Sequence, residues 1–172
     1  MIPIVYASTT GNTEHVAFRM LELWPGDEPL QLVPLDALDQ TLIDQSHALI
    51  LGISTWNFGE LQEDWEAAWD SVCRLNFNDK HVAVFGLGDQ LGYGEWFVDA
   101  MGLLAEQLSV SGAMLTGEWS AEGYSFDASK AFDQTSNTFV GLALDEDSQS
   151  YDTDARIVAW LRMLYETFKY YR

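Results

Sequence analysis

The chain has 172 residues, which is the size of about one domain and enough to bury a hydrophobic core. Hydrophobic residues make up 48% of it and aromatic residues 13%, which excludes a disordered chain. Eight Lys and Arg residues stand against 27 Asp and Glu residues, for a formal net charge of −19. Such a field repels phosphate groups, so it argues against partners such as nucleic acids or anionic membranes and favours basic proteins.

Cysteine and histidine usage excludes several kinds of site. Cys73 is the single cysteine, so an intramolecular disulfide and Cys-ligated metal clusters are excluded. The three histidines do not stand at metal-ligand spacings. The sequence has neither a signal-peptide pattern nor an apolar run of about 20 residues. We therefore expect a cytoplasmic protein without a metal.

The first third of the chain alternates between strand and helix patterns. An apolar strand is expected at Ile2–Tyr6, followed by a helix that ends before Pro25. A second strand is expected at Leu30–Pro34. A short helix or turn over residues 36–45 then leads to the next strand.

Two continuous apolar runs mark the centre of the predicted sheet. Residues 48–53 and 82–86 show no alternation of polar and apolar side chains, which is typical of parallel strands buried on both faces. A helix is expected at Glu63–Val72 between them. A second helix follows the later strand, and its apolar face is formed by Phe97, Met101, Leu104 and Leu108.

The last third contains a long polar segment. Residues 114–117 look like the start of an edge strand, and residues 139–144 look like a strand again. The intervening residues 118–138 are too many and too polar for an ordinary connection, so we interpret them as an insertion that splits the fifth strand. A final helix begins near Asp152.

This alternation predicts an α/β fold in which helices cover both faces of a five-stranded parallel sheet. The leading topology is the doubly wound order 2-1-3-4-5. No repeat, linker or low-complexity tract divides residues 1–172, so we expect a single domain. In such sheets ligands bind beyond the carboxyl ends of the strands, which directs attention to the loops after strands 1, 3 and 4.

The loop after strand 1 has the composition of an anion site. It combines hydroxyl side chains with the start of a helix, whose N–H groups attract anions. It has no Lys and matches neither the P-loop nor the dinucleotide fingerprint. Taken alone, it could equally be a Thr-rich helix cap. Its residues are Ser8, Thr9, Thr10, Gly11, Asn12 and Thr13.

The other two loops present aromatic side chains. Trp56 follows the central strand, where it could either cap the core or stack on a ring. Tyr93 stands between Gly92 and Gly94 in a loop with four glycines in nine residues, where the alternative is an exposed tyrosine in a flexible turn. Together the three loops suggest a site for a mononucleotide with a large flat base.

At these three loops the sequence resembles the long-chain flavodoxins, and the stretches 62–67 and 88–97 are similar to the bacterial second, or B-type, subgroup. The motifs are Ser8-Thr9-Thr10-Gly11-Asn12-Thr13-Glu14, Thr55-Trp56-Asn57-Phe58-Gly59-Glu60-Leu61 and Gly88-Asp89-Gln90-Leu91-Gly92-Tyr93. The likeness runs from strand 1 to the last helix. It implies a flavodoxin-like fold, non-covalently bound FMN and one-electron transfer between proteins.

The resemblance also implies a role for each loop. Residues 8–13 would bind the phosphate, Trp56 and Tyr93 would cover the two faces of the flavin, and Asp89 would bond its pyrimidine edge. The peptide between Asn57 and Phe58 would face flavin N5, although neither residue is the glycine that eases rotation of this peptide in some relatives. The full set implied to bind the cofactor is Ser8, Thr9, Thr10, Gly11, Asn12, Thr13, Ser54, Thr55, Trp56, Asn57, Phe58, Gly59, Leu87, Gly88, Asp89 and Tyr93.

We expect a low-potential, monomeric electron carrier rather than an enzyme, because the strong negative charge disfavours further negative charge on the flavin. A basic flavodoxin or ferredoxin reductase would dock on acidic residues near the loops, with Glu60, Glu63, Asp64 and Glu95 as candidates. Two alternatives remain. An NAD(P)H:quinone reductase would need a nicotinamide or quinone pocket, and a receiver module would need an acidic cluster that strand 1 lacks.

Overall fold

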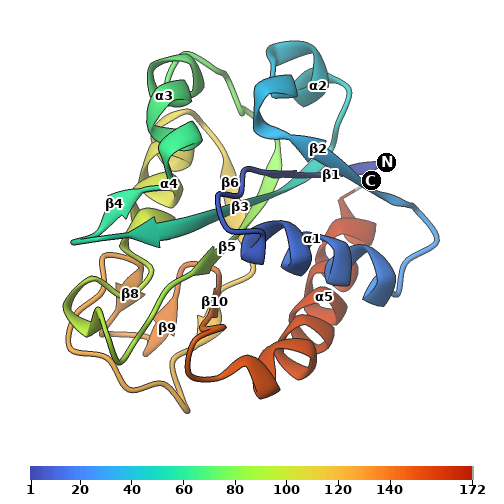
Figure 1. The fold of residues 1–172 in the computed structure, drawn as a ribbon. Helices are drawn as coiled ribbons and strands as arrows, with labels where there is room; N and C mark the ends of the chain where they lie inside the picture. The colour runs from blue at the N-terminus through green and yellow to red at the C-terminus, as the bar shows by residue number, and fades with distance from the viewer. Residues whose placement is uncertain (172) are drawn as a thin grey trace.

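The computed structural model describes residues 1–171. Five parallel strands form the main path of the seven-stranded central sheet: β1 (Ile2–Tyr6), β2 (Leu30–Pro34), β3 (Ala48–Trp56), β5 (His81–Leu87) and β10 (Leu142–Leu144). They lie in the order β10-β5-β3-β1-β2 (Figure 1). With β5 and β10 as the fourth and fifth strands, this is the predicted doubly wound order, which is therefore confirmed.

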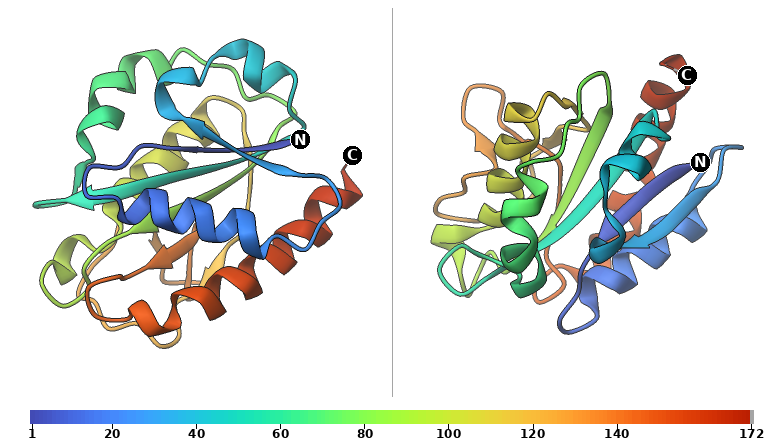
Figure 2. Two further views of the ribbon diagram at one scale, coloured as in Figure 1. Left: turned by 45° about the vertical axis from the view of Figure 1, so that its right-hand side comes forward. Right: turned by 90° about the horizontal axis from the view of Figure 1, so that it is seen from above.

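Helices cover both faces of the sheet (Figure 2). One face carries α1 (Asn12–Leu23) and α5 (Thr153–Tyr170). The other carries α3 (Glu63–Val72), α4 (Asp99–Val110) and α2 (Gln40–Asp44). Apolar side chains face the sheet from both layers, so β3 and β5 are buried on both sides, as their continuous apolar sequences predicted.

Several predicted boundaries differ from the structure. The short helix or turn expected over residues 36–45 consists of a 3₁₀ turn, η1 (Leu35–Ala37), followed by α2. Phe97 is buried but precedes α4, which begins at Asp99. Strand β3 continues beyond residue 53 to Trp56 because β4 (Glu60–Leu61) turns back and pairs with its end. Short 3₁₀ turns η2 (Gly94–Trp96) and η3 (Ser150–Asp152) complete the elements near the loops.

The insertion interrupts the fifth strand, as predicted. β6 (Met114–Thr116) pairs with the first part of β5, and β10 pairs with its last part. Between them the chain forms a separate antiparallel sheet of β7 (Trp119–Ser120), β9 (Thr138–Phe139) and β8 (Phe132–Asp133). The expected strand over residues 139–144 is thus wrong in its first part, since Phe139 pairs within the insertion. Gly141 then passes close to the backbone of Val84, which leaves no room for a side chain.

Two kinds of feature are missing from the described residues. None of the helices within residues 1–171 combines the length and the hydrophobicity that a membrane span requires. Across the same residues, His, Cys, Asp and Glu side chains form no group of three or more that could hold a metal ion.

Candidate functional site

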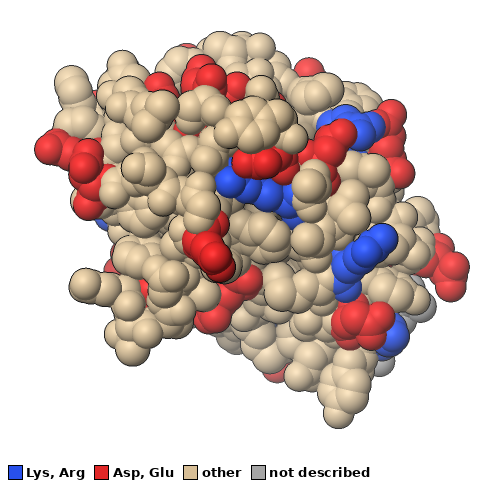
Figure 3. Space-filling model, turned by 90° about the horizontal axis from the view of Figure 1, so that it is seen from below, with Lys and Arg blue, Asp and Glu red and all other residues tan. Residues whose placement is uncertain are grey.

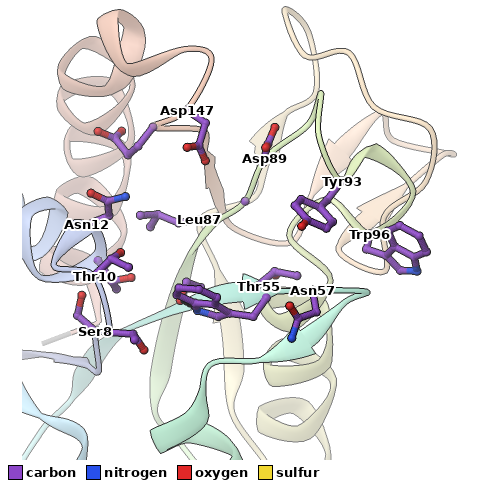
Figure 4. Close-up of a pocket in the computed structure, with 16 residues that line it drawn as sticks. Ser8, Thr10, Asn12, Thr55, Asn57, Leu87, Asp89, Tyr93, Trp96 and Asp147 are labelled. Atoms are coloured by element: carbon purple, nitrogen blue, oxygen red, sulfur yellow. Dashed lines mark hydrogen bonds between the residues drawn. The ribbon is translucent and has the colours of Figure 1, made fainter.

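A cavity of about 440 Å³ lies at the carboxyl ends of β1, β3 and β5, where the topology predicts a ligand site (Figure 4). Side chains of the 8–13 loop line one side of it, and Tyr93 and Asn57 lie across from Thr10 and Asn12 (Figure 4). The complete lining is Ser8, Thr9, Thr10, Asn12, Thr13, Ser54, Thr55, Trp56, Asn57, Leu87, Gly88, Asp89, Tyr93, Trp96, Glu146 and Asp147.

Most of the predicted site residues therefore come together in one cavity. Three of them, Gly11, Phe58 and Gly59, do not line it. Gly11 precedes α1 with φ 92°, a left-handed conformation that favours glycine, and its N–H donates to Ser8 Oγ at 3.1 Å. Gly11 thus determines the backbone conformation of the 8–13 loop without lining the cavity itself.

The start of α1 opens into the cavity without a side-chain cap from the described residues. The N–H groups of a first helical turn lack intrahelical partners, and the helix dipole makes this end attractive to anions. Asn12 and Thr13 from this turn both line the cavity. None of the lining residues is Lys or Arg. An anion here would be bound by neutral donors alone.

Thr9 is held by a residue that the sequence did not single out. Gln62 is fully buried, and its Nε2 donates to Thr9 Oγ1 at 3.0 Å. Its Oε1 accepts from the N–H groups of Asp64 and Trp65 and so caps α3. The Gln62 side chain therefore accepts hydrogen bonds from free N–H groups at the start of α3 and also holds the 8–13 loop through Thr9. These bonds account for a buried amide at this position.

The turn after β3 adopts a left-handed conformation at a residue other than glycine. Asn57 has φ 45° and Gly59 has φ 88°. Asparagine tolerates this region better than most residues, and here its Nδ2 also donates to Glu60 Oε2 at 2.8 Å. The Phe58 side chain is 68% exposed and packs edge-on against Trp96, with the ring centroids 5.1 Å apart. Phe58 thus lies at the rim of the cavity.

Asp89 organises the loop that carries Tyr93. Its Oδ1 accepts from the N–H groups of Leu91 and Gly92 at 3.1 and 2.7 Å, and its carbonyl oxygen accepts from Tyr93 N–H at 3.0 Å. These bonds fold the glycine-rich segment into a tight turn and fix the backbone of Tyr93. The Tyr93 side chain is 45% exposed, so part of it remains available to a ligand.

The sequence prediction missed the acidic residues after β10. Glu146 and Asp147 line the cavity, and Figure 4 shows Asp147 at the same end as Asp89. Burial raises the pKa of Asp147, and the charges of Asp89 and Asp145 raise it further. Glu146 and Asp147 follow the parallel strand β10 at its carboxyl end. The rule that ligands bind at the carboxyl ends of parallel strands could therefore have identified them, as it identified the other loops.

Asp145 itself is a buried anion beside the site. Burial alone would raise its pKa, but hydrogen bonds from Ser148 and Gln90 outweigh that effect and hold the pKa below its ordinary value. Its Oδ2 accepts from Gln90 N–H at 3.0 Å and from Gln90 Nε2 at 2.9 Å. The carboxylate therefore joins the loop after β5 to the loop after β10.

Comparisons with known proteins agree with this architecture. The Flavodoxin family model matches residues 4–160. Flavodoxin 2 of Escherichia coli (strain K12) is 46% identical over 161 residues, which are 94% of this chain and 92% of that protein. A flavodoxin of Synechocystis sp. is 43% identical over 160 residues, which are 93% of each chain.

A solved structure shares the fold over almost its whole length. The crystal structure of Fusobacterium nucleatum flavodoxin bound to flavin mononucleotide superposes with a TM-score of 0.88 at 26% identity. The match covers 97% of this chain and 98% of that one. Fold, sequence and the extent of both matches lead to one conclusion: the chain belongs to the flavodoxin family.

Proposed function

We propose that this protein is a one-electron carrier that uses non-covalently bound FMN. One observation carries the proposal: a single cavity joins the uncapped start of α1 to Trp56 and Tyr93. Its volume of about 440 Å³ lies within the range of small-molecule sites. These features fit a molecule that has a phosphate at one end and a flat aromatic ring at the other.

The phosphate would bind at the 8–13 loop. The hydroxyl groups of Ser8, Thr9 and Thr10 and the first N–H groups of α1 supply donors, and the helix dipole supplies a favourable field. The lining contains no basic residue, so the phosphate charge is not neutralised. The bound cofactor therefore adds to an already negative site.

The ring would lie between Trp56 and Tyr93. Asp89 would bond the pyrimidine edge, and the peptide between Asn57 and Phe58 would face N5. When bound, FMN supplies the ability to take up and release single electrons. The protein's own contribution is to exclude water with the two aromatic side chains and to surround the ring with negative charge, including that of Glu146 and Asp147. This charge disfavours a further anion, which lowers the reduction potential.

Redox partners would dock on the acidic rim of the cavity. We take Glu60, Glu63, Asp64 and Glu95 as this rim; all four are exposed, and none of them lines the cavity itself. On the side of α5, Figure 3 shows Lys and Arg side chains lying among Asp and Glu side chains, and Arg19 and Lys169 are ion-paired. The net charge of −19 keeps the field toward a basic reductase negative and supports a transient, salt-sensitive complex.

Stepwise anaerobic reduction of the FMN-loaded protein, followed by visible absorbance, tests the proposal. A one-electron carrier should pass through two resolved one-electron steps, with a distinct spectrum at the midpoint. A single two-electron step would instead support the quinone-reductase alternative. The cavity gives that alternative little support, because it offers no basic side chain to an NADPH phosphate.

A further inference from the structure

Gln62 is a completely buried amide that lies next to the cavity lining without being part of it. Its Nε2 donates to Thr9 Oγ1 at 3.0 Å and to Asp64 Oδ2 at 2.8 Å. Its Oε1 accepts from the N–H groups of Asp64 and Trp65 at 3.1 and 3.2 Å. Because these two N–H groups at the start of α3 require an acceptor, the amide oxygen must face the helix and the amide nitrogen must face Thr9.

The bond between Gln62 and Thr9 joins a firmly held residue to an exposed loop. Trp65, three residues after Gln62, is fully buried, and its Nε1 donates to the carbonyl oxygen of Gly52 in β3 at 3.1 Å. The carbonyl oxygen of Gln62 accepts from Glu66 N–H at 3.0 Å, so the backbone of Gln62 is bonded into α3. Thr9 is exposed. Gln62 is therefore the fixed end of this bond, and the 8–13 loop is the end that it holds.

The same bond determines what the Thr9 hydroxyl group can do. Its Oγ1 accepts from Gln62, so its own proton must be donated to a different group. Oγ1 lies 3.5 Å from Glu63 Oε1, a distance at which a hydrogen bond is weak. Thr9 also lines the cavity. An anionic phosphate oxygen bound at the 8–13 loop would be a strong acceptor for this proton, and little would be lost when the proton leaves Glu63.

We propose that Gln62 is a positioning residue for the phosphate end of the cavity, and that it acts by holding Thr9 with its hydroxyl group ready to donate. The proposal rests on the proposed FMN site, because it assigns a residue to the binding of the FMN phosphate. It has a consequence that separates it from a purely structural role. Gln62 should favour a flavin that carries a phosphate, and it should have little influence on a flavin that does not.

Two flavins that differ only in the phosphate test this consequence. The apoprotein is titrated with FMN and with riboflavin, and the Kd of each is measured from flavin fluorescence. Gln62→Met keeps the length of the side chain but removes its bond to Thr9. We expect this variant to raise the Kd for FMN about tenfold, the effect of about one hydrogen bond, and to leave the Kd for riboflavin within about twofold.

Ser46→Ala is the matched control, since it also removes a hydrogen bond made by a buried, uncharged side chain. Ser46 is 3% exposed, and its Oγ donates to the carbonyl oxygen of Leu42 in α2 at 2.7 Å. Neither residue lines the cavity. This variant should lower the free energy of unfolding and leave the Kd values for both flavins within about twofold.

A double-mutant cycle tests whether Gln62 acts through Thr9. Thr9→Val keeps the shape of the side chain but removes the oxygen that Gln62 holds. We expect Gln62→Met to change the Kd for FMN by less than about twofold in a protein that already carries Thr9→Val, because the bond is already absent there. Equal effects of Gln62→Met in the two backgrounds would show that Gln62 acts by another route, and they would overturn the proposal.

A second variant keeps the test decisive if Gln62→Met does not fold. Gln62 also caps α3, so that substitution costs stability. Gln62→Glu then takes its place in the cycle, because a carboxylate still accepts from the helix N–H groups but has no proton to donate to Thr9. Repulsion between the new charge and the phosphate would persist in the Thr9→Val background, whereas a positioning effect would not.

The outcomes separate the positioning role from a structural role and from the proposed function. Failure of both Gln62 variants to fold, or an equal loss of affinity for FMN and riboflavin, would mean that Gln62 only supports the fold, and the positioning role would be rejected. If the unaltered protein binds no FMN, the proposed function fails and the positioning role with it. Normal FMN binding by a folded Gln62 variant removes the positioning role alone.

Discussion

Trp56 and Ser54 are joined by a hydrogen bond between the indole Nε1 and the serine Oγ, 2.9 Å apart at the end of β3. Residues two apart on a strand point to the same side, so the bond holds the indole beside its own strand. Both residues line the cavity. The ring is therefore oriented before any ligand arrives, which reduces the ordering that binding would otherwise require.

Removal of either aromatic wall should weaken FMN binding. We expect Trp56→Ala and Tyr93→Ala each to reduce the binding free energy by about 1–3 kcal/mol, the magnitude for a base stacked on an aromatic side chain. Titration of the apoprotein followed by flavin fluorescence measures this. Tyr170→Ala is the control, since that side chain is 79% exposed near the end of α5. Unchanged affinity in both wall variants would mean that the ring lies elsewhere.

The turn after β3 should tolerate a methyl group poorly at Gly59. Gly59 and Gly123 share a φ of 88°, but a Cβ on Gly59 would approach Asp99 Oδ2 to 2.7 Å, whereas Gly123 has open space. We expect Gly123→Ala to cost about 1 kcal/mol of unfolding free energy from backbone strain alone. Gly59→Ala should cost more, because the buried carboxylate must move as well. Urea unfolding of the two variants measures both, and equal costs would show that the contact with Asp99 carries no energy.

Asp145 should stabilise the fold in a pH-dependent way. Its pKa is depressed in the folded state, so its contribution is complete above the ordinary aspartate pKa of about 3.9 and is lost as the pH falls through the folded value. We expect Asp145→Asn to lower the unfolding free energy by about 2 kcal/mol at pH 7, because it removes bonds to a buried charge. In urea unfolding from pH 7 to pH 3, the difference from the unaltered protein should shrink below about pH 4.

Asp147→Asn is the matched control for Asp145. The pKa of Asp147 is raised in the fold, chiefly by burial, so its charged form is disfavoured there. This variant should therefore keep or slightly increase the stability at pH 7. A loss as large as that of Asp145→Asn would contradict the distinction between the two carboxylates.

Charge reversal on the acidic rim should slow reduction by a basic reductase. Glu63 and Asp64 begin α3 beside the 8–13 loop and are exposed. We expect Glu63→Lys with Asp64→Lys to lower the bimolecular rate constant about tenfold at low ionic strength, with the difference fading above about 0.5 M salt. Stopped-flow reduction measures this rate. Asp27→Lys with Glu106→Lys alters the net charge equally on residues outside the rim and should have a smaller effect, and equal slowing would implicate net charge rather than a docking face.

The fold could be predicted from the sequence wherever near neighbours along the chain determine the structure. The uninterrupted apolar sequences of β3 and β5 predicted that both faces of these strands are buried. The length of the polar segment between β6 and β10 predicted that the fifth strand is divided. The pairing of β4 escaped prediction, because a two-residue strand leaves no periodic pattern and depends on the extension of β3 to Trp56.

The site was predictable only in part, for a related reason. Strand order and loop composition were enough to predict that the side chains of the 8–13 loop, Trp56 and Tyr93 line one cavity. Gln62 and Asp145 could not be identified, because their hydrogen-bond partners lie far away in the sequence, at Thr9 and Gln90. Nothing in the local pattern distinguishes such a buried amide or carboxylate from an exposed one.

The division of the fifth strand also bears on whether this edge of the sheet can pair with another chain. The free edge of a sheet can recruit another chain, and long flat edges are the most hazardous. Here that edge consists of two three-residue pieces, β6 and β10, and the chain leaves the sheet between them. A neighbouring strand would find no uninterrupted backbone to pair with. The same interruption that creates the insertion therefore makes this edge of the sheet a poor template for pairing with another strand.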